Sequence, residues 1–174
     1  MKSPFASMKR VFTGRGTDVL KILLTAAAAT LLILATATHA QMPAPDPDAL
    51  WNYITRENPY PRWQSWPDHQ GMRPGKAPHG SLHKVFVNEQ ALKSVRWPLQ
   101  SGAIEVKENY SPEKELLGLT VMYKVRGYNP DGGDWFWANY SPSGKVQKYG
   151  KPAGCIGCHG IKSYNDFVMV HEFK

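Results

Sequence analysis

The only two cysteines of the chain lie close together near its C-terminal end, in the sequence Cys155-Ile156-Gly157-Cys158-His159. This C-x-x-C-H pattern is the attachment sequence of c-type haem. Two thiols at this spacing can bond the two vinyl groups on one edge of a porphyrin, and the histidine that follows then lies beneath the iron as its axial ligand. The motif predicts one haem c per chain, attached through Cys155 and Cys158, with its iron ligated by His159.

Two other kinds of site also use closely spaced cysteines. A thioredoxin-type dithiol normally begins a helix within a βαβ unit, and we see no such unit in this sequence. A zinc site needs about four ligands, and the chain has no second pair of cysteines. Haem attachment is therefore the interpretation that best fits the motif.

Residues 1–40 have the three parts of a secretory signal peptide. A basic stretch extends to Lys21, an apolar segment runs from Ile22 to Ala35, and small residues lead to Ala40. The apolar segment is about 14 residues long, which is short for the ~20 residues of a membrane-spanning helix. We expect cleavage near Ala40 rather than retention as an anchor, and hence a periplasmic protein. Export agrees with the motif, because c-type haem is attached outside the cytoplasm.

The positive charge of the chain comes mostly from this leader. The whole chain has 21 basic and 14 acidic residues, for a formal net charge of +7. Without residues 1–40, 16 basic and 13 acidic residues remain, for a net charge of +3. These basic residues do not gather in one run, so the sequence does not predict nucleic-acid binding.

The sequence after the leader predicts an α+β fold that is mainly antiparallel sheet with a few short helices. The clearest strand is 117–125, where five apolar side chains recur at every second position. Other strands are expected at 82–87, 103–109, 134–140 and 145–149. One short helix, capped by Asp48, is expected to end before Asn58, and a second, capped by Asn88, is expected to extend through Val95. Turn-forming residues separate successive strands and indicate consecutive hairpins. We divide the exported part into a linker with an N-terminal helix at 41–58 and a haem domain at 59–174.

Several segments resemble the cytochrome P-460 family. They are His79–Asn88, Ser101–Tyr110, Gly133–Ala138, the motif with the glycine before it (Gly154–His159), and Asp166-Phe167-Val168. The resemblance spans roughly residues 79–170. It implies a large antiparallel sheet with a haem packed on it and, usually, a homodimer. It also implies either of two activities, because founding members oxidise hydroxylamine whereas the related cytochromes c′-beta bind nitric oxide and other small gases.

One lysine separates these two activities within the family. In the hydroxylamine-oxidising members, a strand lysine in a Gly-Ala-x-x-Val-Lys-Glu sequence is covalently bonded to a haem meso carbon, and Lys107 occupies the matching position here. The resemblance therefore makes Lys107 a candidate catalytic and haem-binding residue. Strand lysines more often face solvent. In either case, alternation places Ala103 and Glu105 on the same face as Lys107, with Ile104 and Val106 on the opposite face.

The other side of the iron is less defined by the sequence. A simple electron carrier would supply a second axial ligand, for which Met122, His79, His83 and His171 are available. The resemblance instead implies an open position lined by apolar and aromatic groups, for which the candidates are Tyr123, Trp135, Phe136 and Trp137. Hydroxylamine oxidation releases protons, and the carboxylates near these segments are Glu105, Glu108 and Asp134.

Three functions therefore compete: oxidation of hydroxylamine or a similar small nitrogen compound, binding of nitric oxide or another gas, and simple electron transfer. The first is the interpretation that we take forward. It requires a small nitrogen-containing or gaseous ligand and a soluble redox partner.

Overall fold

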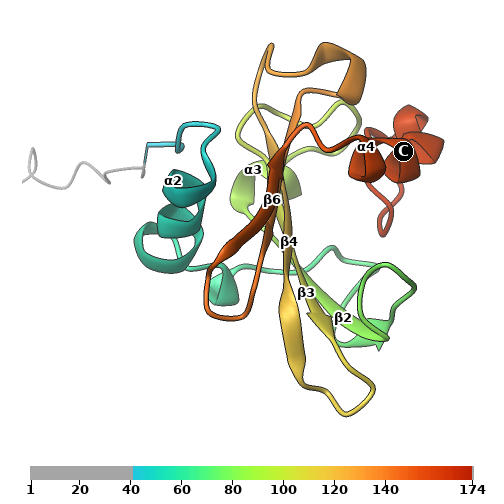
Figure 1. Cartoon of the computed structure of the whole chain (residues 1–174). Coiled ribbons are helices and arrows are strands. Elements are labelled where there is room, and N and C mark those ends of the chain that lie inside the picture. Colours follow the sequence, from blue (N-terminus) through green and yellow to red (C-terminus); the bar gives the residue numbers. More distant parts are fainter. Residues whose placement is uncertain (1–40, 174) are drawn as a thin grey trace, which may run out of the picture. The chain divides into compact units, whose positions relative to one another are not determined.

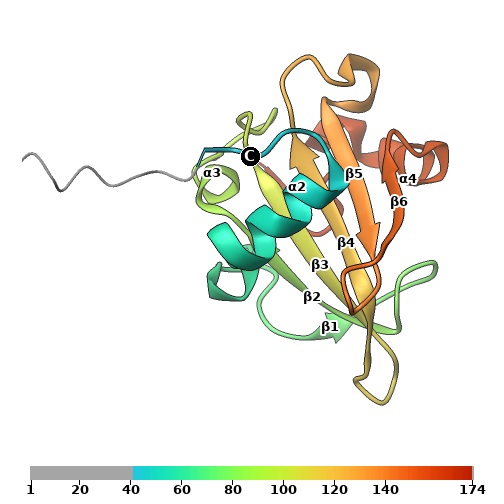
Figure 2. The same ribbon diagram turned by 60° about the vertical axis from the view of Figure 1, so that its left-hand side comes forward.

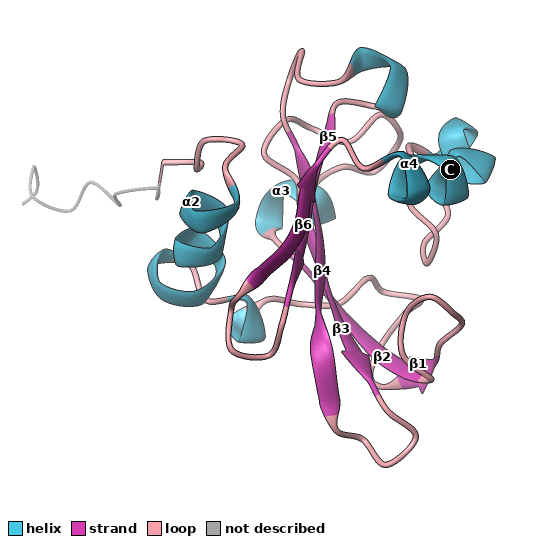
Figure 3. Ribbon diagram, viewed as in Figure 1, coloured by secondary structure: helices cyan, strands magenta, loops and turns pink. Residues whose placement is uncertain are grey.

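Six antiparallel strands, arranged in chain order, form the centre of the structure. The structure is a computed structural model that describes residues 41–173, so the predictions for residues 1–40 lie outside the described residues. The strands are β1 (Arg73–Pro74), β2 (Leu82–Val87), β3 (Ile104–Tyr110), β4 (Leu116–Lys124), β5 (Trp135–Tyr140) and β6 (Val146–Gly150). Every strand pairs with its neighbours in the chain. Figure 3 shows these strands in magenta, with the helices in cyan. The predicted α+β fold of consecutive hairpins is confirmed.

The predicted strands agree with the observed ones to within one residue at each end. The exception is the two-residue strand β1, which the sequence analysis did not predict. It pairs Arg73 with His83 and Pro74 with Leu82 at the edge of the sheet. A proline is tolerated there because it need not donate a hydrogen bond to a further strand.

The N-terminal helix begins two residues earlier than predicted. Helix α2 (Pro47–Asn52) continues as a π-helical turn, η1 (Tyr53–Glu57), which ends before Asn58, as expected. Its cap is Asp46 rather than Asp48, since Asp46 Oδ1 accepts hydrogen bonds from the backbone amides of Asp48 and Ala49 at 3.0 and 2.9 Å. Pro47 explains the shift, because its fixed φ and missing N–H suit the first position of a helix.

Asn88 caps helix α3 (Glu89–Leu92), as predicted, although the helix ends before Val95. The Asn88 side chain is buried, and its Oδ1 accepts hydrogen bonds from the amides of Ala91 and Ile104 at 3.0 and 2.9 Å. Its Nδ2 donates to the carbonyl of Gly102 at 2.7 Å. One side chain thus joins α3 to the start of β3.

We expect Asn88→Ala to lower the free energy of unfolding by about 3 kcal/mol, because it removes a helix cap and leaves buried backbone groups unpaired. The comparison is Asp46→Ala at the exposed cap of α2, for which we expect about 1 kcal/mol. Urea unfolding of both variants measures the difference. Equal losses would show that burial of the Asn88 network adds nothing.

The sheet separates two groups of helices. Helix α2 lies on one side of the sheet, and α4 (Ala153–His159) lies on the other side with the 3₁₀ turn η4 (Gly160–Asn165) (Figure 1). Figure 2 shows α2 crossing in front of the strands. Two further 3₁₀ turns, η2 (Tyr60–Arg62) and η3 (Pro130–Gly132), lie in the connections.

Each face of the sheet has its own apolar cluster, and the period-two pattern of the strands separates them. On the α2 side, Leu50 and Ile54 of the helical segment pack with Ile104, Val106 and other strand residues. On the α4 side, the cluster contains Ala103, Met122, Trp135, Trp137 and Phe167, with Cys155 packed against it. Ile104 and Val106 therefore lie opposite Ala103, as predicted.

The segment before α2 is held against the sheet. The Tyr123 hydroxyl donates to the carbonyl of Pro43 at 2.8 Å, and the Tyr140 hydroxyl donates to the carbonyl of Pro47 at 2.7 Å. Pro43 and Pro47 are therefore held against the strands. Within residues 41–173, no helix has the length and apolar character needed to cross a membrane.

Candidate functional site

Helix α4 presents the cysteine motif to the sheet. Residues three and four positions apart lie on the same side of a helix, so Cys155, Cys158 and His159 share one face of α4. Both thiols are free, with Cys155 partly buried against the apolar cluster and Cys158 exposed. The sequence analysis did not predict this helix, whose glycines weaken the helical signal.

The His159 ring is oriented as an axial ligand requires. Its Nδ1 lies 2.9 Å from the carbonyl oxygen of Phe167, and because a carbonyl can only accept, Nδ1 carries the proton. Nε2 is then left with a free lone pair. Burial is the main cause that lowers the pKa of His159, which keeps the imidazole in the neutral form that binds metals. The ring also packs edge-on against Trp137, with centroids 4.7 Å apart.

A buried ion pair holds the carbonyl that orients this histidine. Asp166 lies beside Phe167, and both have a positive φ, of 54° and 64°. The Asp166 carboxylate pairs with Lys124 Nζ, 2.6 Å from Oδ2, and Trp135 Nε1 donates to the Asp166 carbonyl at 2.8 Å. Strands β4 and β5 thus fix a turn that few non-glycine residues adopt.

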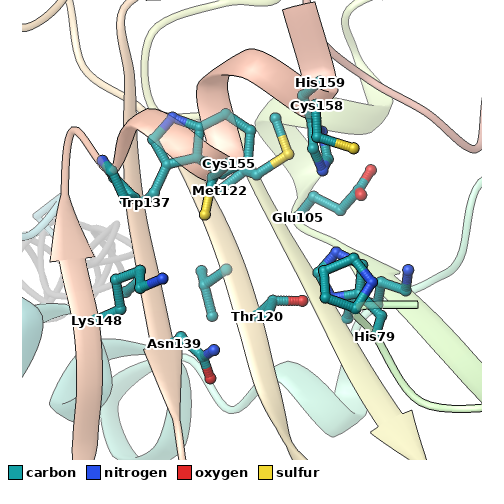
Figure 4. A pocket seen from close by; sticks show the side chains of 16 residues that line it. His79, Glu105, Thr120, Met122, Trp137, Asn139, Lys148, Cys155, Cys158 and His159 are labelled. Atoms are coloured by element: carbon teal, nitrogen blue, oxygen red, sulfur yellow. The ribbon is translucent and has the colours of Figure 1, made fainter. Parts of the chain in front are cut away.

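A cavity of about 270 Å³ lies between α4 and the sheet. Two rows of paired residues form its sheet wall: Glu105, Met122 and Trp137 in one row, and Lys107, Thr120 and Asn139 in the next. Figure 4 shows Cys155, Cys158 and His159 on the other side of the same space. The remaining lining residues are Pro78, His79, Val121, Ala138, Lys148, Pro152 and Gly154.

Lys107 lies in this cavity and not on a solvent-exposed face. It shares the lining with Glu105, as the alternation of β3 predicted. Burial lowers the pKa of the Lys107 ammonium group, while the neighbouring Glu105 and Cys158 act in the opposite direction. The structure thus brings Lys107 together with both cysteines and His159, and its chemical role stays a prediction.

Of the three candidate carboxylates, only Glu105 lines the cavity. It is buried, Trp66 Nε1 donates to its Oε2 at 2.7 Å, and burial raises the pKa of its carboxyl group. Glu108 instead accepts hydrogen bonds from the Tyr60 and Tyr110 hydroxyl groups. Asp134 accepts from backbone amides of the 127–129 loop.

The aromatic candidates divide between the two faces. Trp137 lines the cavity, and Trp135 lies in the apolar cluster of the same face. Tyr123 and Phe136 are in the α2-side cluster, so the expectation that they line the cavity is wrong. The reason is the pleat, which turns adjacent side chains of β4 and β5 to opposite faces.

The geometry argues against the two other uses of the cysteines. Residues 41–173 contain no group of three or more His, Cys, Asp or Glu side chains that could hold a metal ion, so these residues offer no zinc site. The sheet has no parallel pair of strands and therefore no βαβ unit. Burial raises the pKa of Cys155, whereas a reactive dithiol needs a lowered thiol pKa.

Three polar lining residues were not among the sequence candidates: Thr120, Asn139 and Lys148. The signal that identifies the first two is the strand alternation itself, since Thr120 is two positions from Met122 and Asn139 is two positions from Trp137. Among the histidines, His79 also lines the cavity. His171 lies elsewhere, stacked on Trp66 and hydrogen-bonded to Asp68.

His83 is buried beside this site and makes the free energy of unfolding depend on pH. Its Nε2 lies 2.7 Å from His69 Nε2, its Nδ1 has no partner among the described residues, and burial is the main cause that lowers its pKa to about 4. The unfolded chain, with a histidine pKa near 6.5, binds more protons between these two values. The His83 contribution is therefore present above about pH 6.5 and is lost as the pH falls toward 4.

When the pH falls from 6.5 to 4, we expect the free energy of unfolding to decrease less in His83→Gln than in the parent protein. The difference between the two decreases should reach up to about 3 kcal/mol. Urea unfolding at a series of pH values measures both curves, and their difference isolates His83 from the carboxylates that titrate in the same range. Parallel curves would show that His83 titrates alike in the folded and unfolded chains.

The arrangement of these groups suits a c-type haem. Two free thiols and a neutral imidazole with a free nitrogen face a wall that contains Met122 and Trp137. The indole nitrogen of Trp137 is buried and has no hydrogen-bond partner among the described residues. Haem held here would be attached by the two cysteines and ligated by His159.

Comparison with known proteins identifies the family of the chain. A search of curated proteins finds no match. The family model described as Cytochrome P460 matches residues 59–170, which include the whole sheet and helix α4. The chain therefore belongs to the cytochrome P460 family and is a c-type haem protein.

Proposed function

We propose that this protein is an exported, mono-haem c-type cytochrome that oxidises hydroxylamine or a closely related small nitrogen compound. The observation that carries the proposal is the position of Lys107, whose side chain shares one cavity with Cys155, Cys158 and His159. The resemblance associates a lysine at this position with hydroxylamine oxidation.

Haem held at this site would supply an iron that can accept electrons from a bound compound. The residues of the chain divide the remaining tasks. Cys155 and Cys158 would hold the haem, and His159, which is oriented through its Nδ1, would ligate the iron. Met122 and Trp137 form the wall of the sheet and help to exclude water.

Glu105 is the proton acceptor in this proposal. Its Oε2 is engaged by Trp66, which leaves Oε1 available toward the cavity. Burial raises the pKa of Glu105 and so strengthens it as a base. Glu105 would therefore accept the protons that oxidation of the compound releases, in the same cavity that would hold the haem.

The proposal includes export, with a mature chain that begins near Gln41 and works in the periplasm. Intact mass of protein from a host that exports c-type cytochromes tests this, and a mass that includes residues 1–40 would contradict it. It also includes a homodimer and a soluble electron acceptor.

The test of function is hydroxylamine-dependent reduction of a soluble electron acceptor by the purified haem protein. We expect catalytic turnover, together with a red-shifted Soret band if Lys107 is bonded to the haem. Stable nitric oxide binding without turnover would assign the protein to the gas-binding function instead. An absence of both would favour simple electron transfer.

A further inference from the structure

His79 lies across the cavity from the axial histidine. It belongs to the loop that precedes β2, whereas His159 ends α4, and both line the same cavity. Their ring centroids are 6.4 Å apart and their planes are inclined by 88°. Figure 4 shows the two imidazoles on opposite sides of the space beside Glu105.

This separation is compatible with two imidazoles that bind one metal from opposite sides. A metal–imidazole bond is about 2 Å long, so a metal bound between two histidines places the ring centroids roughly 6 Å apart. Perpendicular ring planes are compatible with such a pair, because each ring can rotate about its own metal–nitrogen bond. The centroid separation of 6.4 Å is therefore long enough for one iron between the rings.

Both rings have a nitrogen available. The Nδ1 of His159 is occupied by the Phe167 carbonyl, so its Nε2 is free. No hydrogen bond engages the side chain of His79 within residues 41–173, so a lone pair of its neutral ring is free as well.

The loop that carries His79 is packed closely against the sheet. The backbone amide of Gly75 donates to the carbonyl of Ser81 at 2.7 Å. The backbone amide of His79 donates to the carbonyl of Lys76 at 3.1 Å. A Cβ on Gly80 would lie only 2.2 Å from the carbonyl oxygen of Tyr110, so this glycine allows direct backbone contact with β3. The position of His79 is therefore set by the fold.

The other possible ligands fit less well. Of the histidines in the described chain, only His79 and His159 line the cavity. The Nε2 of His83 lies 2.7 Å from His69. Met122 lies in the sheet wall, in the same row as Glu105 and Trp137.

We propose that His79 is the second axial ligand of the haem iron in the resting protein, opposite His159, and that a small nitrogen compound or gas must displace it to reach the iron. This differs from the open position that the family resemblance implies. The inference rests on the haem site of the proposed function, but it does not depend on hydroxylamine turnover.

The test is the spin state of the purified ferric haem protein, measured by electron paramagnetic resonance and resonance Raman spectroscopy. We expect a six-coordinate low-spin signal in the parent protein and its loss in both His79→Ala and His79→Phe. The phenylalanine keeps the volume of the side chain, so it guards against a packing defect. Added imidazole should restore the low-spin signal in His79→Ala, and the control His83→Ala should keep it.

Two results would overturn the inference: a high-spin parent protein, or a low-spin signal that survives in His79→Phe and is lost in Met122→Leu. Turnover distinguishes this inference from the proposed function. A low-spin parent that depends on His79 but never oxidises hydroxylamine, even as His79→Ala, would retain the inference and reject the function. A high-spin parent protein that oxidises hydroxylamine would reject the inference and retain the proposed function.

Discussion

Replacing Lys107 with alanine is expected to lower hydroxylamine turnover by roughly 100-fold or more, the scale of losing one preorganised group in an active site. The haem should stay attached, because Cys155 and Cys158 lie on α4 and not on β3. The reason for the large effect is position. Lys107 is in the cavity lining, and the pKa of its ammonium group responds to both Glu105 and Cys158.

Two further variants separate the causes of this effect. Lys107→Arg keeps the positive charge but removes the primary amine, so it should resemble the alanine variant if a bond to the haem is required and the parent protein if charge alone matters. Lys84→Ala removes a lysine from the neighbouring strand, where Val85 is in the α4-side cluster and Lys84 therefore faces the other way. We expect this control to keep its turnover.

The bond itself has a direct readout. Proteolysis of the parent protein should give one haem-containing species that joins the peptide with Lys107 to the peptide with Cys155 and Cys158. Mass spectrometry of the digest measures this species. Unchanged turnover in Lys107→Ala would remove the lysine from the mechanism whatever the digest shows.

The double variant Cys155→Ser with Cys158→Ser is expected to lose all covalently bound haem. A serine hydroxyl does not replace the thiol in the bond to a vinyl group, and residues 41–173 contain no other cysteine. We expect each single variant to keep one thioether bond. Haem staining after denaturing electrophoresis, together with acid-acetone extraction, measures what remains attached.

The substitution should spare the rest of the fold. Cys158 is exposed, and Cys155 is only partly buried, so two serines remove little apolar contact. The control is thermal unfolding of the parent and variant polypeptides produced without haem, which should be similar. Haem that is extracted intact from the parent protein by acid acetone would contradict covalent attachment.

The sequence by itself determined the features that depend on local geometry. Period-two alternation placed Ile104 and Val106 opposite Lys107, because the pleat of a strand requires it whatever the sheet packs against. The role of Asn88 as a cap followed from its side chain and the helix-forming residues after it. The order of the strands followed from turns that join each strand to the next.

Only the tertiary structure decided which residues meet at the site. Alternation leaves both faces of β3 equivalent until α2 covers one and α4 the other, and this choice turned Lys107 inward. It also selected Glu105 over Glu108 and Asp134, which the sequence could not rank. His79 and His159 are eighty positions apart in the sequence, so no local pattern relates them. Their approach depends on packing between distant segments, which is the part of folding that short-range propensity does not encode.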